Sequence, residues 1–205
     1  MAELMAGWSN TPNPTFVDLY DKWGQGAWGA VLTGTLHPHP IPFSHLSDNR
    51  KGNVQVDINH LGTPFDPALP GPYTDKESNP DLVSLWAQYA AATQQHGPPA
   101  IVQICHPGRQ SVRVAGRRGL FAPTIAPSAI PLVMGDGWLG RVLGGIVFPA
   151  PREMTQADID AVTARFVDAA RLMADAGFSG VQLHGAHGYL IGTVLLPLSE
   201  RSERC

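Results

Sequence analysis

The 205-residue sequence predicts an α/β fold built from parallel βα units. Three short apolar runs are expected to form buried strands: WGAVLTG (28–34), AIVQICH (100–106) and FSGVQLHG (178–185). Helical patterns lie between the runs, and alternation of strand and helix is typical of a parallel sheet. Because the runs are apolar throughout, we expect the sheet to be covered on both faces.

Two helices are expected between these strands. The segment 79–97 ends at Gly97 and has an apolar face formed by Leu82, Leu85, Trp86 and Tyr89. The segment 155–178 begins with Thr155 and Asp158, whose spacing is typical of a capping box, and ends at Gly177. Its apolar stripe at helical spacing consists of Ile159, Val162, Phe166, Ala170 and Met173.

Composition argues against several classes of partner. The formal net charge is −3, so no basic face indicates nucleic acid or an acidic membrane surface. There is no apolar run long enough to span a membrane, and the start MAELMAGWSN lacks the features of a secretory signal. The cysteines, Cys105 and Cys205, form no CxxC pair and no disulfide framework. We therefore expect a cytoplasmic, reducing environment.

The stretch HGAHGYL (184–190) is the first candidate site. His184 closes a predicted strand, His187 and Tyr189 follow in the loop, and parallel βα folds build their sites at the carboxyl ends of strands. A metal site would need further ligands, and no HExxH, CxxC or acidic neighbour supplies them. Besides this weaker metal interpretation, two others are open: a structural turn, or two ring N–H groups that hold a developing oxyanion while Tyr189 delivers a proton.

The stretch QICHPGRQS (103–111) is the second candidate site, again at the end of a strand. The carboxamide of Gln103 suits the edge of a flat heterocycle, although a half-buried strand glutamine would look the same. Arg109 suits a phosphate or carboxylate, or a structural ion pair. Gly34, at the end of the first apolar run, permits close approach of the backbone to a ligand.

The stretch 35–52 does not fit a compact βα repeat. It is rich in proline and polar residues and contains three histidines that suggest metal binding by type alone: His37, His39 and His45. Prolines separate them and nothing fixes their geometry, so we expect a solvated loop and no metal.

Taken together, the motifs resemble the old yellow enzyme family of FMN-dependent NADH:flavin oxidoreductases and ene-reductases. QICHPGRQS, PSAIPL, PREMT and AGFSGVQLHGAHGYL occur in the order and spacing of that family. MAELMA and LYDKWGQGAWGAVLTG resemble its NADH-oxidase-like branch. The resemblance implies a TIM (β/α)₈ barrel, FMN as the cofactor and NADH or NADPH as the hydride donor. The partner it implies is a small activated alkene such as an α,β-unsaturated carbonyl compound.

The resemblance also implies roles for single residues. His184 and His187 match the pair that binds the carbonyl or nitro oxygen of the substrate above the flavin. Tyr189 matches the proton donor, and Gln103 matches the glutamine that bonds the pyrimidine edge of FMN. Ala2 and Gly34 match the positions where the first and second strands of the family touch the flavin.

The resemblance covers only the first four βα units of a barrel that takes about 250 residues. We expect one incomplete TIM-barrel domain over 1–205, with an atypical insertion at 35–52 and an atypical tail at 191–205. A retained intron and a frameshift or missed splice would explain both, and transcript sequencing tests this. The alternatives are a truncated, inactive fragment that associates through its open strand edges, homo-oligomers included, and a metal-dependent TIM-barrel lyase using His184 and His187.

Overall fold

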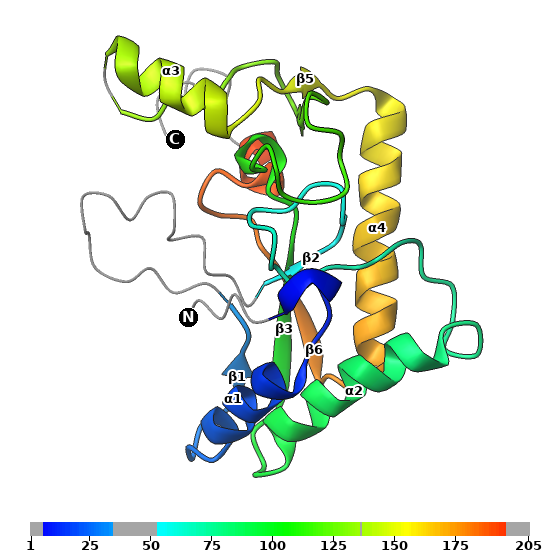
Figure 1. The fold of residues 1–205 in the computed structure, drawn as a ribbon. Coiled ribbons are helices and arrows are strands. Elements are labelled where there is room, and N and C mark those ends of the chain that lie inside the picture. The colour runs from blue at the N-terminus through cyan, green and yellow to red at the C-terminus, as the bar shows by residue number, and fades with distance from the viewer. Residues whose placement is uncertain (1–5, 35–52, 136, 196–205) are drawn as a thin grey trace.

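The computed structural model describes residues 6–34, 53–135 and 137–195. Helices and strands alternate along much of the chain (Figure 1). In chain order they are α1 (Pro14–Gly24), β1 (Val31–Leu32), β2 (Val54–Gln55), α2 (Pro80–Gln94), β3 (Ala100–Cys105), β4 (Ile125–Ala126), α3 (Trp138–Val147), β5 (Arg152–Glu153), α4 (Gln156–Asp175), β6 (Gly180–Leu183) and α5 (Leu190–Leu195).

Strand β3 is the centre of a parallel sheet. Strand β6 pairs with it over Ile101 to Ile104, while β1 pairs with its first half and β2 with its second half. Ile101 of β3 pairs with both β6 and β1, and Ile104 pairs with both β6 and β2. Strand β6 therefore occupies one edge of β3, and β1 and β2 occupy the other. A second parallel pair joins β4 to β5. The predicted parallel α/β class is confirmed.

Strands β1 and β2 lie in line along the same edge of β3. Leu32 pairs with Ile101 and Val54 with Ile104, so both Gly34 and Asn53 fall opposite Gln103 when each register is continued. A Cβ on Gly34 would lie 3.7 Å from Asn53 Oδ1, which places Gly34 beside the Asn53 side chain. The segment 35–52, expected to be an insertion, therefore connects two halves of one strand line, and its own structure lies outside the described residues.

Helices α1, α2 and α4 pack against the sheet and form the main core (Figure 1). Asn13 caps α1 by accepting a hydrogen bond from the backbone N–H of Phe16, and Pro14 begins the helix with a preset φ. Aromatic rings join α1 to α2, with Phe16 and Tyr20 both edge-on to Tyr89. Fully buried side chains of every layer meet there: Phe16, Tyr20, Val54, Trp86, Tyr89, Val102, Ile104, Leu172 and Met173.

The two predicted helices are confirmed, but each apolar face includes an exposed residue, which in α4 is Ile159. Thr155 and Asp158 form the expected capping box, and the residues Gly97 and Gly177 beyond each helix have positive φ angles. In α2, Trp86 and Tyr89 are buried, but Leu85 is 36% exposed, so its assignment to the buried face was wrong. The buried face of α2 turns instead through Ala90 and Thr93, towards α1 and the sheet.

The expectation that every strand is covered on both faces is wrong for β6. Its Leu183 is 57% exposed, and Val181 is exposed beside it. Leu183 lines an apolar hollow of about 620 Å³, together with Ile159, Val162 and Phe166 of α4 and residues of α5. The first half of the predicted α4 stripe therefore faces this hollow, and its second half, at Ala170 and Met173, packs in the core.

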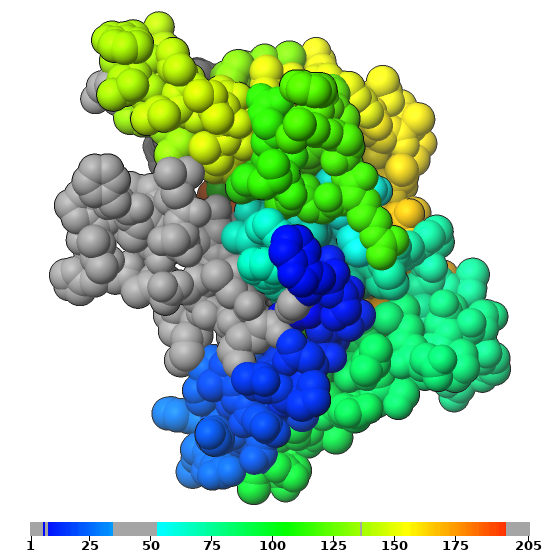
Figure 2. Space-filling view, viewed as in Figure 1, coloured from blue at the N-terminus to red at the C-terminus, as the bar shows by residue number. Residues whose placement is uncertain are grey.

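Helix α3 is an element that was not predicted from the sequence. It stands at the periphery of the molecule (Figure 2) and exposes a run of apolar side chains. Arg113 holds the end of this helix by donating from Nε to Ile146 O and from Nη2 to Gly145 O. The exposed apolar side chains of α3 are Trp138, Leu139, Val142, Leu143 and Ile146.

Candidate active site at the carboxyl ends of β3 and β6

The loop after β6 places the two histidines and the tyrosine of HGAHGYL in one group. The strand ladder continues to His184, whose N–H donates to Ile104 O at 3.0 Å. His187 then adopts a left-handed conformation, with φ of 57°, which is unusual for a residue with a Cβ. This turn folds the chain back so that the Tyr189 N–H donates to Ala186 O at 3.2 Å.

The rings of these three residues gather around His184. His187 Nδ1 lies 3.4 Å from His184 Nε2, and the Tyr189 ring packs edge-on against His184 with centroids 4.6 Å apart. Tyr189 and His184 are buried, whereas His187 is exposed. The two facing nitrogens are close enough for a single oxygen atom to lie within hydrogen-bonding distance of both. Both nitrogens must carry a proton to bind that oxygen.

A row of polar positions runs across the sheet on the amino side of this group. Gln103 of β3 pairs in register with Gln182 of β6, and Gln103 Nε2 donates to Gln182 Oε1 at 2.5 Å. A Cβ on Gly34 would lie 3.8 Å from Gln103 Oε1, so the end of the first strand line adjoins the same amide. Gln182 was not predicted as a site residue. The alternation of side chains along VQLH signals it, because it places Gln182 and His184 on one face.

Two other expectations concern residues beyond this group. Ala2, expected beside the flavin, lies outside the described residues, as do His37, His39 and His45. Arg109, interpreted as a phosphate ligand or a structural pair, is 5% exposed within the turn after β3. Its burial shows that Arg109 is part of the interior of this turn.

The turn after β3 supports the loop after β6. Gly108 has φ of 58° and donates its N–H to His106 Nδ1 at 3.0 Å, which closes a tight turn within 106–108. From this turn the His106 carbonyl accepts the Leu190 N–H at 3.0 Å. The Gln110 side chain donates from Nε2 to His187 O at 2.6 Å. The backbone on both sides of Tyr189 is therefore bonded to the turn after β3.

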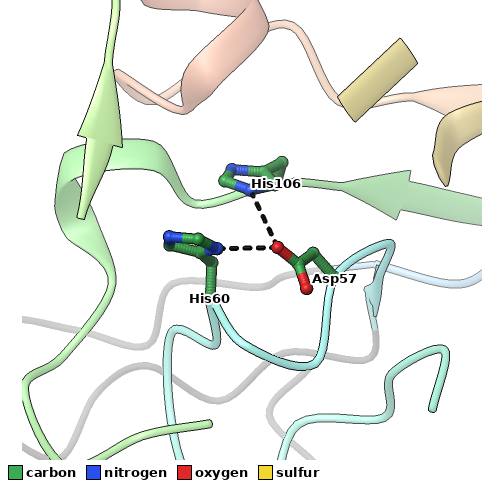
Figure 3. Close-up of side chains that lie close together, drawn as sticks. All are labelled: Asp57, His60 and His106. Atoms are coloured by element: carbon green, nitrogen blue, oxygen red, sulfur yellow. Dashed lines mark hydrogen bonds and ion pairs between the residues drawn. The ribbon is translucent and has the colours of Figure 1, made fainter. Parts of the chain in front are cut away.

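Behind this turn lies a cluster of Asp57, His60 and His106 (Figure 3). His60 Nδ1 is 2.7 Å from Asp57 Oδ2, and His106 Nε2 is 3.9 Å from the same oxygen. Asp57 Oδ1 accepts from the backbone N–H and from the side-chain amide of Asn59, each at 2.9 Å. This cluster was not predicted. The available signal was that Asp57 and His106 each follow a strand, so both lie at the carboxyl ends of strands.

Burial and hydrogen bonding set the charges of the cluster. Burial lowers the pKa of His106 to about 3, and the nearby His60 and Arg118 act in the same direction, while Asp57 opposes them. Burial alone would raise the pKa of Asp57. Hydrogen bonds from His60 and Asn59 more than offset it and hold that pKa well below its usual range. The cluster therefore contains an ionised carboxylate and a neutral His106.

The cluster does not fit a metal ion. The Gly108 N–H donates to His106 Nδ1, so neutral His106 carries its proton on Nε2, the nitrogen that faces Asp57. A metal ligand needs a lone pair on that nitrogen, and metal-bound histidines donate from their other ring nitrogen. His106 does the opposite, and its Nε2 proton faces the carboxylate. The geometry supports a structural role, in which contacts between His60, His106 and the Asp57 carboxylate join two loops.

The polar row fits the ring of a flavin. With Gln103 Nε2 donating to Gln182 Oε1, the pair leaves Gln103 Oε1 as an acceptor and Gln182 Nε2 as a donor. An acceptor and a donor side by side match the polar edge of a flat heterocycle, and His184 lies next along the same face of β6. The site is thus defined as a polar shelf at the carboxyl edge of a parallel sheet, with a His–His–Tyr group above it.

Comparison with known proteins gives the family of this chain. The profile of the NADH:flavin oxidoreductase / NADH oxidase family matches residues 77–205, and the chain belongs to this family. The NADH-dependent flavin oxidoreductase iliE of Neonectria sp. (strain DH2) is 40% identical over 200 residues, which cover 98% of this chain and 23% of the relative. For iccE of Talaromyces variabilis the identity is 39% over 203 residues, covering 99% and 44%.

A solved structure shows a similar fold. The old yellow enzyme homologue from Zymomonas mobilis superposes with a TM-score of 0.64 at 20% identity, covering 94% of this chain and 44% of that one. The chain thus spans less than half the length of these relatives. The resemblance, the enzyme class and the cofactor, FMN with NADH or NADPH as donor, are confirmed at the level of the family. Among the described residues no helix is long and apolar enough to cross a membrane.

Proposed function

We propose that this protein is an FMN-dependent oxidoreductase that passes hydride from NADH or NADPH to an activated alkene, such as an α,β-unsaturated carbonyl compound. The observation that carries the proposal is the gathering of His184, His187 and Tyr189 directly beyond the Gln103–Gln182 amide pair. Donors for an oxyanion, a proton donor and a shelf for a flat ring meet at one edge of the sheet.

Each group has a distinct task in this reaction. Bound FMN would supply the hydride-transfer chemistry between the nicotinamide and the alkene. Gln103 and Gln182 hold the polar edge of the ring. His184 and His187 bind the carbonyl oxygen of the substrate and stabilise the negative charge that develops there. Each such donor raises kcat by about two to three orders of magnitude. Tyr189 gives a proton to the α-carbon.

We further propose that the described sheet forms the first half of a TIM barrel. The parallel pairing of β1, β2 and β6 with β3 supports this, as does the likeness to the Zymomonas mobilis structure. The apolar hollow beside Leu183 gives a physical reason, since a further βα unit packed against β6 would cover that surface. In the barrel the amide pair and the His–His–Tyr group lie at the catalytic, carboxyl end.

Turnover in the presence of added FMN tests the function. The purified protein with FMN, NADH and a cyclic enone is expected to consume NADH in proportion to the enone reduced. Tyr189→Phe removes the proton donor and is expected to slow enone reduction by about 10²- to 10⁴-fold. Tyr73→Phe is the matched control, because it deletes the same hydroxyl from a residue that is hydrogen-bonded to Asp175 at the end of α4. Equal rates for the two variants, or no enone-dependent NADH consumption, would contradict the proposal.

A further inference from the structure

The left-handed backbone of His187 is held from outside its own loop as well as from within it. A residue with a Cβ is strained in this conformation, and such strain persists only where surrounding contacts determine it. Within the loop the Tyr189 N–H closes the turn onto Ala186 O. From outside, the turn after β3 contributes the hydrogen bond of 2.6 Å from Gln110 Nε2 to His187 O.

The turn that carries Gln110 is itself fixed on its other side. A Cβ added to Gly108 would lie 3.4 Å from three Leu190 atoms, so the two residues pack closely, and the His106 carbonyl accepts the Leu190 N–H. His106 is 1% exposed and is held against Asp57 and the ring of His60, with centroids 5.0 Å apart. The loop of Asp57 is thereby connected through His106 to the backbone on the far side of Tyr189.

We propose that Gln110 is a positioning residue of the active site, which holds His187 in the orientation that faces His184, and that Asp57, His60 and His106 anchor the turn from which it acts. This inference rests on the proposed function for its catalytic consequence. Its structural content, the dependence of the His187 backbone on the Gln110 amide, stands apart from that function. The amide nitrogen of Gln110 is the atom that makes the hydrogen bond to the loop.

The test replaces Gln110 by glutamate, which has the same shape and no donor. A carboxylate oxygen would then face the His187 carbonyl oxygen at the position of a 2.6 Å hydrogen bond, so the two would repel. Gln110→Met is the neutral second variant, and it keeps the length of the side chain without a donor. Gln95→Glu is the matched control, since Gln95 is an exposed residue at the end of α2.

Two readouts separate this inference from the proposed function. In NMR spectra without flavin, Gln110→Glu and Gln110→Met are expected to move the amide signals of 187–189 and the ring signals of His187, while Gln95→Glu leaves them in place. With FMN bound, both Gln110 variants are expected to keep the FMN dissociation constant within about twofold and to lower kcat for the enone by about 10- to 100-fold, as for a small misplacement of a catalytic group.

The outcomes divide cleanly. Unmoved His187 signals in both Gln110 variants, or equal movement in Gln95→Glu, would overturn the inference whether or not the protein binds flavin. Moved signals with an unchanged kcat on an active enzyme would also overturn it. Moved signals in a protein that does not bind FMN would contradict the proposed function and leave the positioning of His187 by Gln110 supported.

Discussion

Replacing His106 by glutamine should flatten the acid sensitivity of this fold. His106 is buried and its pKa is lowered to about 3, against about 6.5 in an unfolded chain. Glutamine is neutral at all relevant pH values, and its side-chain oxygen can accept the Gly108 N–H in place of His106 Nδ1. The substitution therefore removes a titrating group while keeping an acceptor for the turn.

The sign follows from proton uptake. As the pH falls below about 6.5 the unfolded chain binds a proton at His106, and the folded protein binds none there until about pH 3. The free energy of unfolding of the wild type therefore falls by about 1.4 kcal/mol per pH unit from this residue. Between pH 6.5 and 4.5 the loss amounts to roughly 2 kcal/mol, because the full slope applies only well below pH 6.5, and this is a large share of a typical domain stability.

Urea unfolding followed by tryptophan fluorescence at half-unit steps from about pH 4.5 to 7 measures this. The pKa of Asp57 is lowered by folding, so its contribution to stability is complete above the unfolded pKa of about 4 and is lost only as the pH falls further, which adds little in this range. His106→Gln is expected to show a slope smaller by about one proton. The control for a histidine-to-glutamine change is His96→Gln, at an exposed histidine outside the cluster. Parallel curves for wild type and His106→Gln would refute the assignment of a neutral, buried His106.

Three further substitutions test the fold. Asp158→Ala removes the capping box of α4 and its ion pair to Arg152, and it should lower the free energy of unfolding by about 1–2 kcal/mol. The control Asp160→Ala should lower it by less than half of that, and equal losses would argue against the cap. Gly116→Ala would place a Cβ 2.6 Å from Ile58 O, whereas Gly97 has a positive φ but open space around it. Gly116→Ala should therefore destabilise the fold more than Gly97→Ala, as measured by the denaturant midpoints of unfolding. Trp86→Ala should cost about 3–5 kcal/mol by calorimetry or urea unfolding, because Trp86 is fully buried in the core; a loss below about 1 kcal/mol would contradict its central place.

The elements that the sequence predicted best are those with strong local signals. Helix α4 has a capping box, a long apolar stripe and a terminal glycine, and it forms as expected. Strand β3 was predicted because its Val102 and Ile104 are apolar and buried under the helices, while Gln103 lies on the other face. Helix α1 was missed although Asn13 and Pro14 are a cap and a first-turn proline, since its apolar residues are few and mostly aromatic. Strand β2 is two residues long and depends on pairing with β3.

The candidate site divides in the same way. His184, His187 and Tyr189 are close in sequence, so a single loop could bring them together and the sequence could nominate them. Gln182 was missed because its role depends on the cross-strand partner Gln103, which is 79 residues away. The cluster of Asp57, His60 and His106 depends on two loops meeting, and no local pattern reports that contact.

The central claim is that the polar shelf around Gln103 binds FMN, and a flavin titration tests it most directly. The protein is titrated with FMN while the flavin fluorescence and visible absorption are followed, for the wild type and for Gln103→Leu. We predict saturable one-to-one binding by the wild type, weakened about tenfold in Gln103→Leu by the loss of a hydrogen bond worth about 1 kcal/mol or slightly more. Absence of binding by the wild type, or equal affinity of the two proteins, would contradict the account.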